Sequence, residues 1–116
     1  MELDELVLDM GNKLLEMGTS NVQVMAVETK TKLAKHLIIC TAENNILARN
    51  VALDFKECYK EQIQCLHTDG AAKGEWVVID YKDIIVHIFT KEARQKYNIE
   101  KLYKDAKNTV QITSQN

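Results

Sequence analysis

The sequence predicts a single α/β (α+β) domain in which a mixed five-stranded sheet packs against helices in the order α-β-β-α-β-β-β-α. Three observations predict this fold class. The chain has 116 residues, a normal length for one domain. Apolar residues recur with helical spacing near the N-terminus and with strand spacing in the second half. Short polar breaks join the last strands, whereas a helix separates the second and third strands and permits parallel pairing between them.

The composition is that of a globular protein. Charged residues make up 28% of the chain and hydrophobic residues 46%. No apolar run approaches the roughly 20 residues that a membrane span requires, and the acidic start, residues 1–5, argues against a secretory signal. The net charge is −2, without a basic stripe that would predict nucleic-acid binding. An odd number of cysteines without CxxC spacing indicates reduced thiols and a cytoplasmic setting; they are Cys40, Cys58 and Cys65.

The first part of the chain is predicted as helix, strand, loop and strand. Residues 3–17 form an amphipathic helix, because apolar residues at spacings of three and four lie on one face, and Gly18 follows as the C′ residue. Residues 22–28 alternate as a strand. Residues 29–35 carry three lysines and are predicted as a loop. Residues 36–41 are apolar enough for a central strand.

A second long helix and a short third strand are predicted next. Asn44 or Asn45 caps a helix that runs to about Gln62. Residues 63–67 are predicted as the third strand and residues 68–74 as a flexible connection. The buried stripe of the helix is predicted to contain Leu47, Ala48, Val51, Ala52, Phe55, Cys58 and Tyr59.

The stretch GEWVVIDYKDIIVHIF, residues 74–89, predicts a β-hairpin that is apolar on both faces. The first two helices can cover one face, so the other carries a contiguous apolar patch, which usually marks an interface. Trp76 is interpreted either as an interface anchor or as a core residue under the small third helix, and the pattern leaves both open. The fourth strand places Trp76, Val78 and Asp80 on one face and Val77, Ile79 and Tyr81 on the other; the fifth places Ile84, Val86 and Ile88 opposite Ile85, His87 and Phe89.

The turn of the hairpin is predicted to be a three-residue link, residues 81–83. Such links need a residue in the left-handed region, so Lys82 is expected there at a cost of about 1 kcal/mol. Asp80 and Asp83 are expected to bond nearby backbone amides, with contact to a basic partner as the functional alternative. His87 is expected either to bond a neighbour on its sheet face or to act as a pH-sensitive interface residue.

The C-terminal part is predicted as a short helix and a polar tail. Thr90 caps a third helix that runs to about Tyr97, and Asn98 interrupts it. Residues 1–108 are predicted to form the domain, and residues 109–116 a disordered tail. The last amphipathic turn is predicted to contain Ile99, Leu102, Tyr103 and Ala106.

The hairpin and the following TKEARQKYNIEKLYKDA, residues 90–106, resemble the signature of the ribosomal silencing factor family, also called RsfS or Iojap-like proteins. Chain length and element order agree over nearly the whole sequence. The resemblance implies a nucleotidyltransferase-like fold without that fold's catalysis and without a cofactor. The matching positions are Trp76, Asp80, Tyr81, Asp83, Val86, His87, Phe89, Arg94, Tyr97, Glu100 and Leu102.

The resemblance also implies a translation repressor. Members of the family bind the large ribosomal subunit at its ribosomal protein number fourteen and sterically prevent the small subunit from joining. The partner-binding residues would then be Trp76 and Tyr81 as apolar anchors, Asp80 and Asp83 facing basic groups, and His87.

Several alternatives accompany this interpretation. The main one is a small nucleotidyltransferase-like enzyme or nucleotide-binding protein, but after residues 18–20, a weak match to its Gly-Ser turn, no paired carboxylates follow to hold two metals. A metal site is not expected, because Cys65 and His67 offer two of the four ligands that structural zinc needs. A homodimer that buries the hairpin face is a further possibility, which could coexist with subunit binding as a storage form. The lysines of residues 29–35 are candidates for contact with ribosomal RNA, with a solvated loop as the default.

Overall fold

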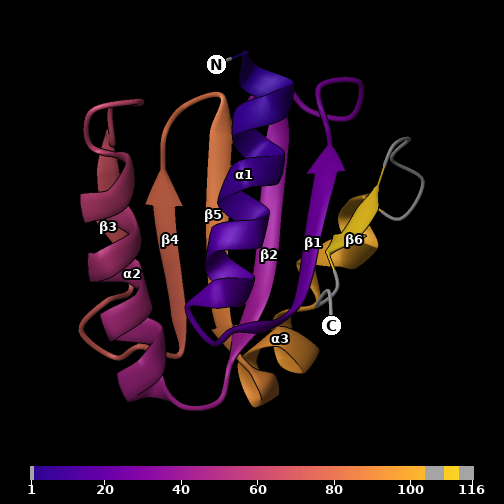
Figure 1. Cartoon of the computed structure of the whole chain (residues 1–116). Coiled ribbons are helices and arrows are strands. Elements are labelled where there is room, and N and C mark those ends of the chain that lie inside the picture. Colours follow the sequence, from indigo (N-terminus) through magenta and orange to yellow (C-terminus); the bar gives the residue numbers. More distant parts are fainter. Residues whose placement is uncertain (1, 104–108, 113–116) are drawn as a thin grey trace.

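The computed structural model describes residues 2–103 and 109–112 and shows a mixed sheet with helices on both faces (Figure 1). The strand order is β3-β4-β5-β2-β1-β6, and the pair β2–β5 is parallel whereas the other neighbours are antiparallel. The mixed α/β class is confirmed, as is the predicted element order as far as α3. The elements are α1 (Leu3–Glu16), β1 (Ser20–Ala26), β2 (His36–Ala42), α2 (Asn45–Tyr59), β3 (His67–Asp69), β4 (Trp76–Asp80), β5 (Ile84–Thr90), α3 (Lys91–Tyr97), the 3-10 helix η1 (Ile99–Tyr103) and β6 (Val110–Ile112).

The two long helices lie side by side on one face of the sheet (Figure 1). Their apolar stripes and the inward side chains of the strands form the larger of two hydrophobic clusters. The stripe predicted for α1 is confirmed by its buried residues Leu6, Val7, Met10 and Leu14. The longest helix, α2, has 15 residues, and over the described part of the chain none is long and apolar enough to cross a membrane.

Three predicted helix ends are confirmed by their capping contacts, whereas α2 ends at Tyr59 and not near Gln62 as predicted. Gly18 follows α1 with φ of +100°, a conformation that glycine adopts without steric cost. The Asn44 side chain accepts a hydrogen bond from the Leu47 N–H at 2.8 Å and begins α2. Thr90 caps α3 by accepting from the Ala93 N–H at 3.4 Å. These ends depend on contacts within a few residues, which the sequence pattern reports directly.

Cys58 is a correction to the predicted stripe of α2. It is exposed, whereas Val51, Phe55 and Tyr59 are buried. These three recur every four residues and form a narrow ridge, and Cys58 lies about 100° around the helix from Tyr59. All three cysteines are free thiols, and Cys40 on β2 is fully buried, which raises its pKa to about 12.

The third strand and the parallel pairing both differ from the prediction. Residues 63–66 form a connector, and pairing begins at His67, opposite Asp80. Ile63 is apolar because it packs on the edge of the core and not because it lies in a strand. The parallel partner of β2 is β5 instead of β3. After α2 the chain runs to the outer edge of the sheet and returns through β4, which places β5 beside β2.

A sixth strand corrects the predicted five-stranded sheet. Val110–Ile112, from the segment predicted to be a disordered tail, pairs antiparallel with β1. Ile112 is 9% exposed and reaches the core near Gly11 of α1. With only three residues, this strand carries too little alternation to stand out in the sequence. Ala106, predicted to lie on the last amphipathic turn, falls outside the described residues.

Candidate partner-binding face

The hairpin has one sealed face and one partly open face. On β4, Val77 and Ile79 are buried under the long helices, whereas Trp76, Val78 and Asp80 are partly exposed. On β5 the same alternation leaves Ile85 and His87 partly exposed. The predicted assignment of these side chains to two faces is confirmed. The side of the sheet away from α1 and α2 is called the second face here.

The end of the second face near α3 is covered by an aromatic stack. The Trp76 ring lies 5.0 Å from the buried Phe89 ring and 4.7 Å from the ring of Tyr97, which extends from α3. Ala93 of α3 is buried in the second hydrophobic cluster with Phe89. Trp76 therefore belongs partly to the core, as one of the two interpretations predicted, while part of the indole remains exposed.

The rest of the second face is hollowed. A depression of about 220 Å³, called the second-face hollow, lies between the hairpin, the loop before β2 and η1. Leu33 on the loop and Leu102 on η1 are 78% and 73% exposed. Such contiguous exposed apolar surface usually marks a binding site. The hollow is lined by Thr31, Leu33, Ala34, Leu37, Val78, Asp80, Ile85, His87, Ile99, Leu102 and Tyr103.

His87 connects the aromatic stack to the hollow. The Trp76 indole N–H donates to His87 Nδ1 at 3.0 Å, which confirms the expected bond to a neighbour on the same sheet face. Burial lowers the pKa of His87 to about 4. The imidazole is therefore neutral near pH 7, and its Nδ1 accepts the indole N–H while the ring forms part of the hollow wall.

Asp80 lies at the end of the hollow, where the turn begins. Its carboxylate accepts a hydrogen bond from the Lys82 N–H at 2.7 Å, as predicted. Lys82 has φ of +74°, which confirms the left-handed residue expected in the three-residue link. The Asp83 carbonyl accepts from the N–H groups of Lys35 and His36 at 2.9 and 3.0 Å and so joins the turn to the start of β2. The expected side-chain bond of Asp83 stays a prediction.

Tyr81 does not share the second face with Trp76. It is 4% exposed, its ring centroid lies 6.4 Å from that of Phe55 on α2, and it packs in the larger cluster. Its hydroxyl is sealed from solvent and has no hydrogen-bond partner among the described residues. Of the residues predicted to bind a partner, the structure brings Trp76, Asp80 and His87 together on one face and places Tyr81 in the core behind them.

Replacement of Tyr81 by phenylalanine is expected to leave the chain equally stable or to raise its free energy of unfolding by about 1 kcal/mol. The change removes a buried hydroxyl that lacks a partner, and such a group is costly to keep. The matched control is Tyr59→Phe, because the Tyr59 hydroxyl donates to Asp9 at 2.7 Å; that variant should lose about 1 kcal/mol. Urea denaturation measures both, and a larger loss for Tyr81→Phe than for Tyr59→Phe would contradict this account.

The residues weighed for an enzyme or a metal site have structural contacts. Thr19, in the glycine-containing turn, donates its hydroxyl to the Leu14 carbonyl at 2.7 Å and closes the end of α1. Cys65 contacts the His67 carbonyl through its thiol at 3.6 Å. Within residues 2–103 and 109–112, no group of three or more His, Cys, Asp or Glu side chains could hold a metal ion.

Sequence reasoning did not bring Leu33 and Leu102 to the hollow. Leu33 lies in a loop without a periodic pattern, and the predicted amphipathic turn that contains Leu102 does not say which surface it packs against. Lys30, Lys32 and Lys35 are exposed on the same loop. The signal that pointed to this surface was the hairpin with apolar residues on both faces.

Comparison with known proteins gives a consistent result. A family model described as "Ribosomal silencing factor during starvation" matches residues 2–116. The chain is 34% identical to the ribosomal silencing factor RsfS of Halalkalibacterium halodurans over 87 residues, or 72% of this chain and 74% of that protein. It is 30% identical to RsfS of Bacillus subtilis over 87 residues, 74% of each. A crystal structure of a Chromobacterium violaceum protein has the same fold, with a TM-score of 0.85 and 24% identity over 98% of this chain and 92% of that one.

Proposed function

The chain belongs to the ribosomal silencing factor family, and on that premise we propose that it binds the large ribosomal subunit and represses translation. The proposed contact is ribosomal protein number fourteen of that subunit, as the resemblance in the hairpin implies. Bound there, the protein prevents the small subunit from joining. It acts as a cytoplasmic binding protein and not as an enzyme, and needs no cofactor.

The observation that supports this proposal is the partly open second face. Interfaces between proteins combine an apolar centre with a polar rim. The second-face hollow supplies the apolar centre through Val78, Ile85 and Leu37. Asp80 at its end and the exposed lysines of residues 29–35 supply polar groups around it. A partner that inserts an apolar side chain into this hollow would cover the part of the second face that α3 leaves exposed.

Steric exclusion requires no chemistry from the bound protein. The protein measures 34 × 33 × 33 Å. Bound to the surface of the large subunit that faces the small subunit, a molecule of this size occupies space that the small subunit needs. The silencing effect then depends on affinity and on the placement of the binding face.

Substitution of Val78 by lysine tests the proposed face. Val78 is partly exposed on the lining of the hollow, so a charge there should weaken binding to the large subunit about tenfold while the fold is kept. The matched control is Leu53→Lys, because Leu53 is 62% exposed on α2, on the other side of the sheet; its binding should not change. Co-sedimentation with purified large subunits measures affinity, and a subunit-joining assay measures silencing.

Two outcomes would contradict the proposal. Folded Val78→Lys that binds as tightly as wild type would show that the partner uses another face. A pure chain that sediments as a dimer at micromolar concentration, becomes a monomer in Val78→Lys, and does not bind the large subunit would show that the hollow receives a second copy instead of the ribosome.

A further inference from the structure

We infer that Arg94 is a positioning residue that holds η1 against the sheet and so keeps the second-face hollow in the shape that receives the partner. The inference rests on the proposed function, because the hollow is the proposed binding surface. It concerns a residue that does not line the hollow and to which the sequence pattern assigned no role.

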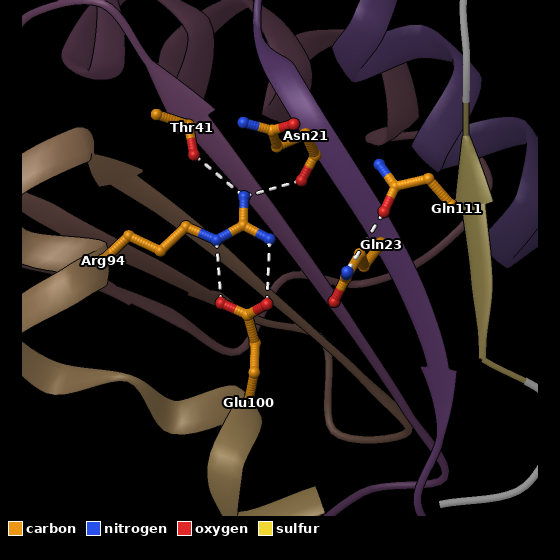
Figure 2. Close-up of polar contacts among 6 residues, drawn as sticks. All are labelled: Asn21, Gln23, Thr41, Arg94, Glu100 and Gln111. Atoms are coloured by element: carbon orange, nitrogen blue, oxygen red, sulfur yellow. Dashed lines mark hydrogen bonds and ion pairs between the residues drawn. The ribbon is translucent and has the colours of Figure 1, made fainter. Parts of the chain in front are cut away.

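The Arg94 side chain connects α3 to three other elements (Figure 2). Its Nε and Nη2 donate to the two carboxylate oxygens of Glu100 on η1, at 2.8 and 3.2 Å. Its Nη1 donates to the Asn21 carbonyl of β1 at 2.6 Å and to the Thr41 hydroxyl of β2 at 2.8 Å. The side chain is 12% exposed. One guanidinium therefore ties η1 to two strands in the sheet.

The backbone of Arg94 fixes the same corner. Asn98 caps the C-terminal end of α3 with φ of +42°, and its N–H donates to the Arg94 carbonyl at 2.9 Å. The Lys101 N–H then donates to the Asn98 carbonyl at 3.1 Å and begins the 3-10 turn. The direction in which η1 leaves α3 is thus set at Asn98, and its distance from the sheet is set by the pair with Glu100.

Packing alone holds η1 weakly. Ile99 and Tyr103 pack against the second hydrophobic cluster, but none of the five residues of η1 is fully buried. Short 3-10 segments have poorer hydrogen-bond geometry than α-helices, and segments with few buried contacts open at low free energy. Yet Ile99, Leu102 and Tyr103 of this element form one wall of the hollow. The bidentate pair, partly buried and charge-assisted, joins η1 to the guanidinium that also donates to both strands.

Lysine cannot reproduce this arrangement. The four bonds of Arg94 use four of the five N–H groups in a planar fork, two toward a carboxylate and two toward the strands. A lysine ammonium is a compact charge on a flexible stem and cannot span both sets. Arg94→Lys therefore keeps the charge while it removes the geometry.

The experiment compares Arg94→Lys with Arg49→Lys. Arg49 lies on α2 and donates one hydrogen bond to the Ala72 carbonyl at 3.0 Å, away from the hollow. Two quantities are measured in each variant: amide hydrogen exchange along the whole chain, and affinity for purified large ribosomal subunits. In Arg94→Lys, amides of residues 99–103 should lose protection while those of β2 and β5 keep it. If η1 then lies against the sheet in only about one molecule in ten, the affinity for the subunit falls about tenfold. Arg49→Lys should leave both quantities unchanged.

Glu100→Gln provides a second variant in case Arg94→Lys does not fold. Because Glu100 is 27% exposed, this change should leave the fold intact. Glutamine keeps the shape of the side chain and loses its charge. The affinity of this variant for the subunit, and the protection of residues 99–103, should therefore lie between those of wild type and Arg94→Lys. Unchanged protection at residues 99–103 in both variants would overturn the inference, as would lost protection with unchanged affinity. If wild type does not bind the subunit at all, the proposed function fails, while loss of protection confined to η1 would still support the hold of Arg94 on that element.

Discussion

Trp76→Ala is expected to weaken binding to the large ribosomal subunit about 30-fold or more, corresponding to a loss of about 2 kcal/mol. Trp76 supports the second face as well as contributing to its surface. Its ring stacks on Phe89 and contacts Tyr97 at a tilt, and its N–H donates to Nδ1 of His87 on the hollow wall. Alanine removes that support, leaves the imidazole nitrogen without its donor, and removes the exposed part of the indole.

Trp76→Phe is the matched control for this prediction. It keeps an aromatic ring in the stack but lacks the N–H that His87 accepts, so its affinity should lie between those of wild type and Trp76→Ala. Affinity is measured by quantitative co-sedimentation, and thermal unfolding of each variant establishes that it is folded at the temperature used. A folded Trp76→Ala that binds within about threefold of wild type, a difference below 1 kcal/mol, would exclude Trp76 as a binding residue.

Gly70→Ala is expected to lower the free energy of unfolding by about 3 kcal/mol. Gly70 has φ of +81°, and an added Cβ would lie 1.9 Å from the Trp76 carbonyl oxygen. The left-handed conformation costs a non-glycine residue about 1 kcal/mol, and the overlap with backbone adds about 2 kcal/mol because the connection and β4 must move apart. Since the displaced carbonyl belongs to Trp76, subunit binding should weaken together with stability.

Gly18→Ala separates the two contributions. Gly18 has φ of +100°, yet an added Cβ would meet no atom within 4 Å. This variant should therefore lose only about 1 kcal/mol, from conformation alone. Urea denaturation gives both values. Equal losses at the two positions would show that the connection before β4 yields freely and that the close approach to Trp76 has no energetic consequence.

Features set by neighbours along the chain were predicted correctly. The apolar spacing of α1, the caps at Asn44 and Thr90, and the left-handed Lys82 depend on contacts within a few residues. The two faces of the hairpin follow from the strict alternation of side chains along a strand. The shared placement of Trp76 and Asp80 could therefore be predicted, and the same alternation already placed Tyr81 on the opposite face; the placement of His87 beside them depends on how β5 pairs with β4.

Features set by contacts between distant segments were not predicted. β6 has three residues, too few for alternation to identify it, and β3 begins four residues later than predicted; the partners of both were decided by which sheet edges the chain reaches. The parallel neighbour of β2 depends on the crossover through β3 and β4. The walls of the hollow come from a loop and from η1, brought to the hairpin by the turn at the start of β2 and by the Arg94–Glu100 pair.

The sequence by itself determined that the last two strands are apolar on both faces. Residue types are given by the sequence, and side chains alternate between faces in any strand, so no contact with a distant segment is needed. Only the tertiary structure decided how much of the second face stays open. That amount depends on the positions of α3 and η1 on the second face. Hydrogen bonds from Arg94 to η1 and to two strands help to fix these positions, and no periodic pattern in the sequence predicts them.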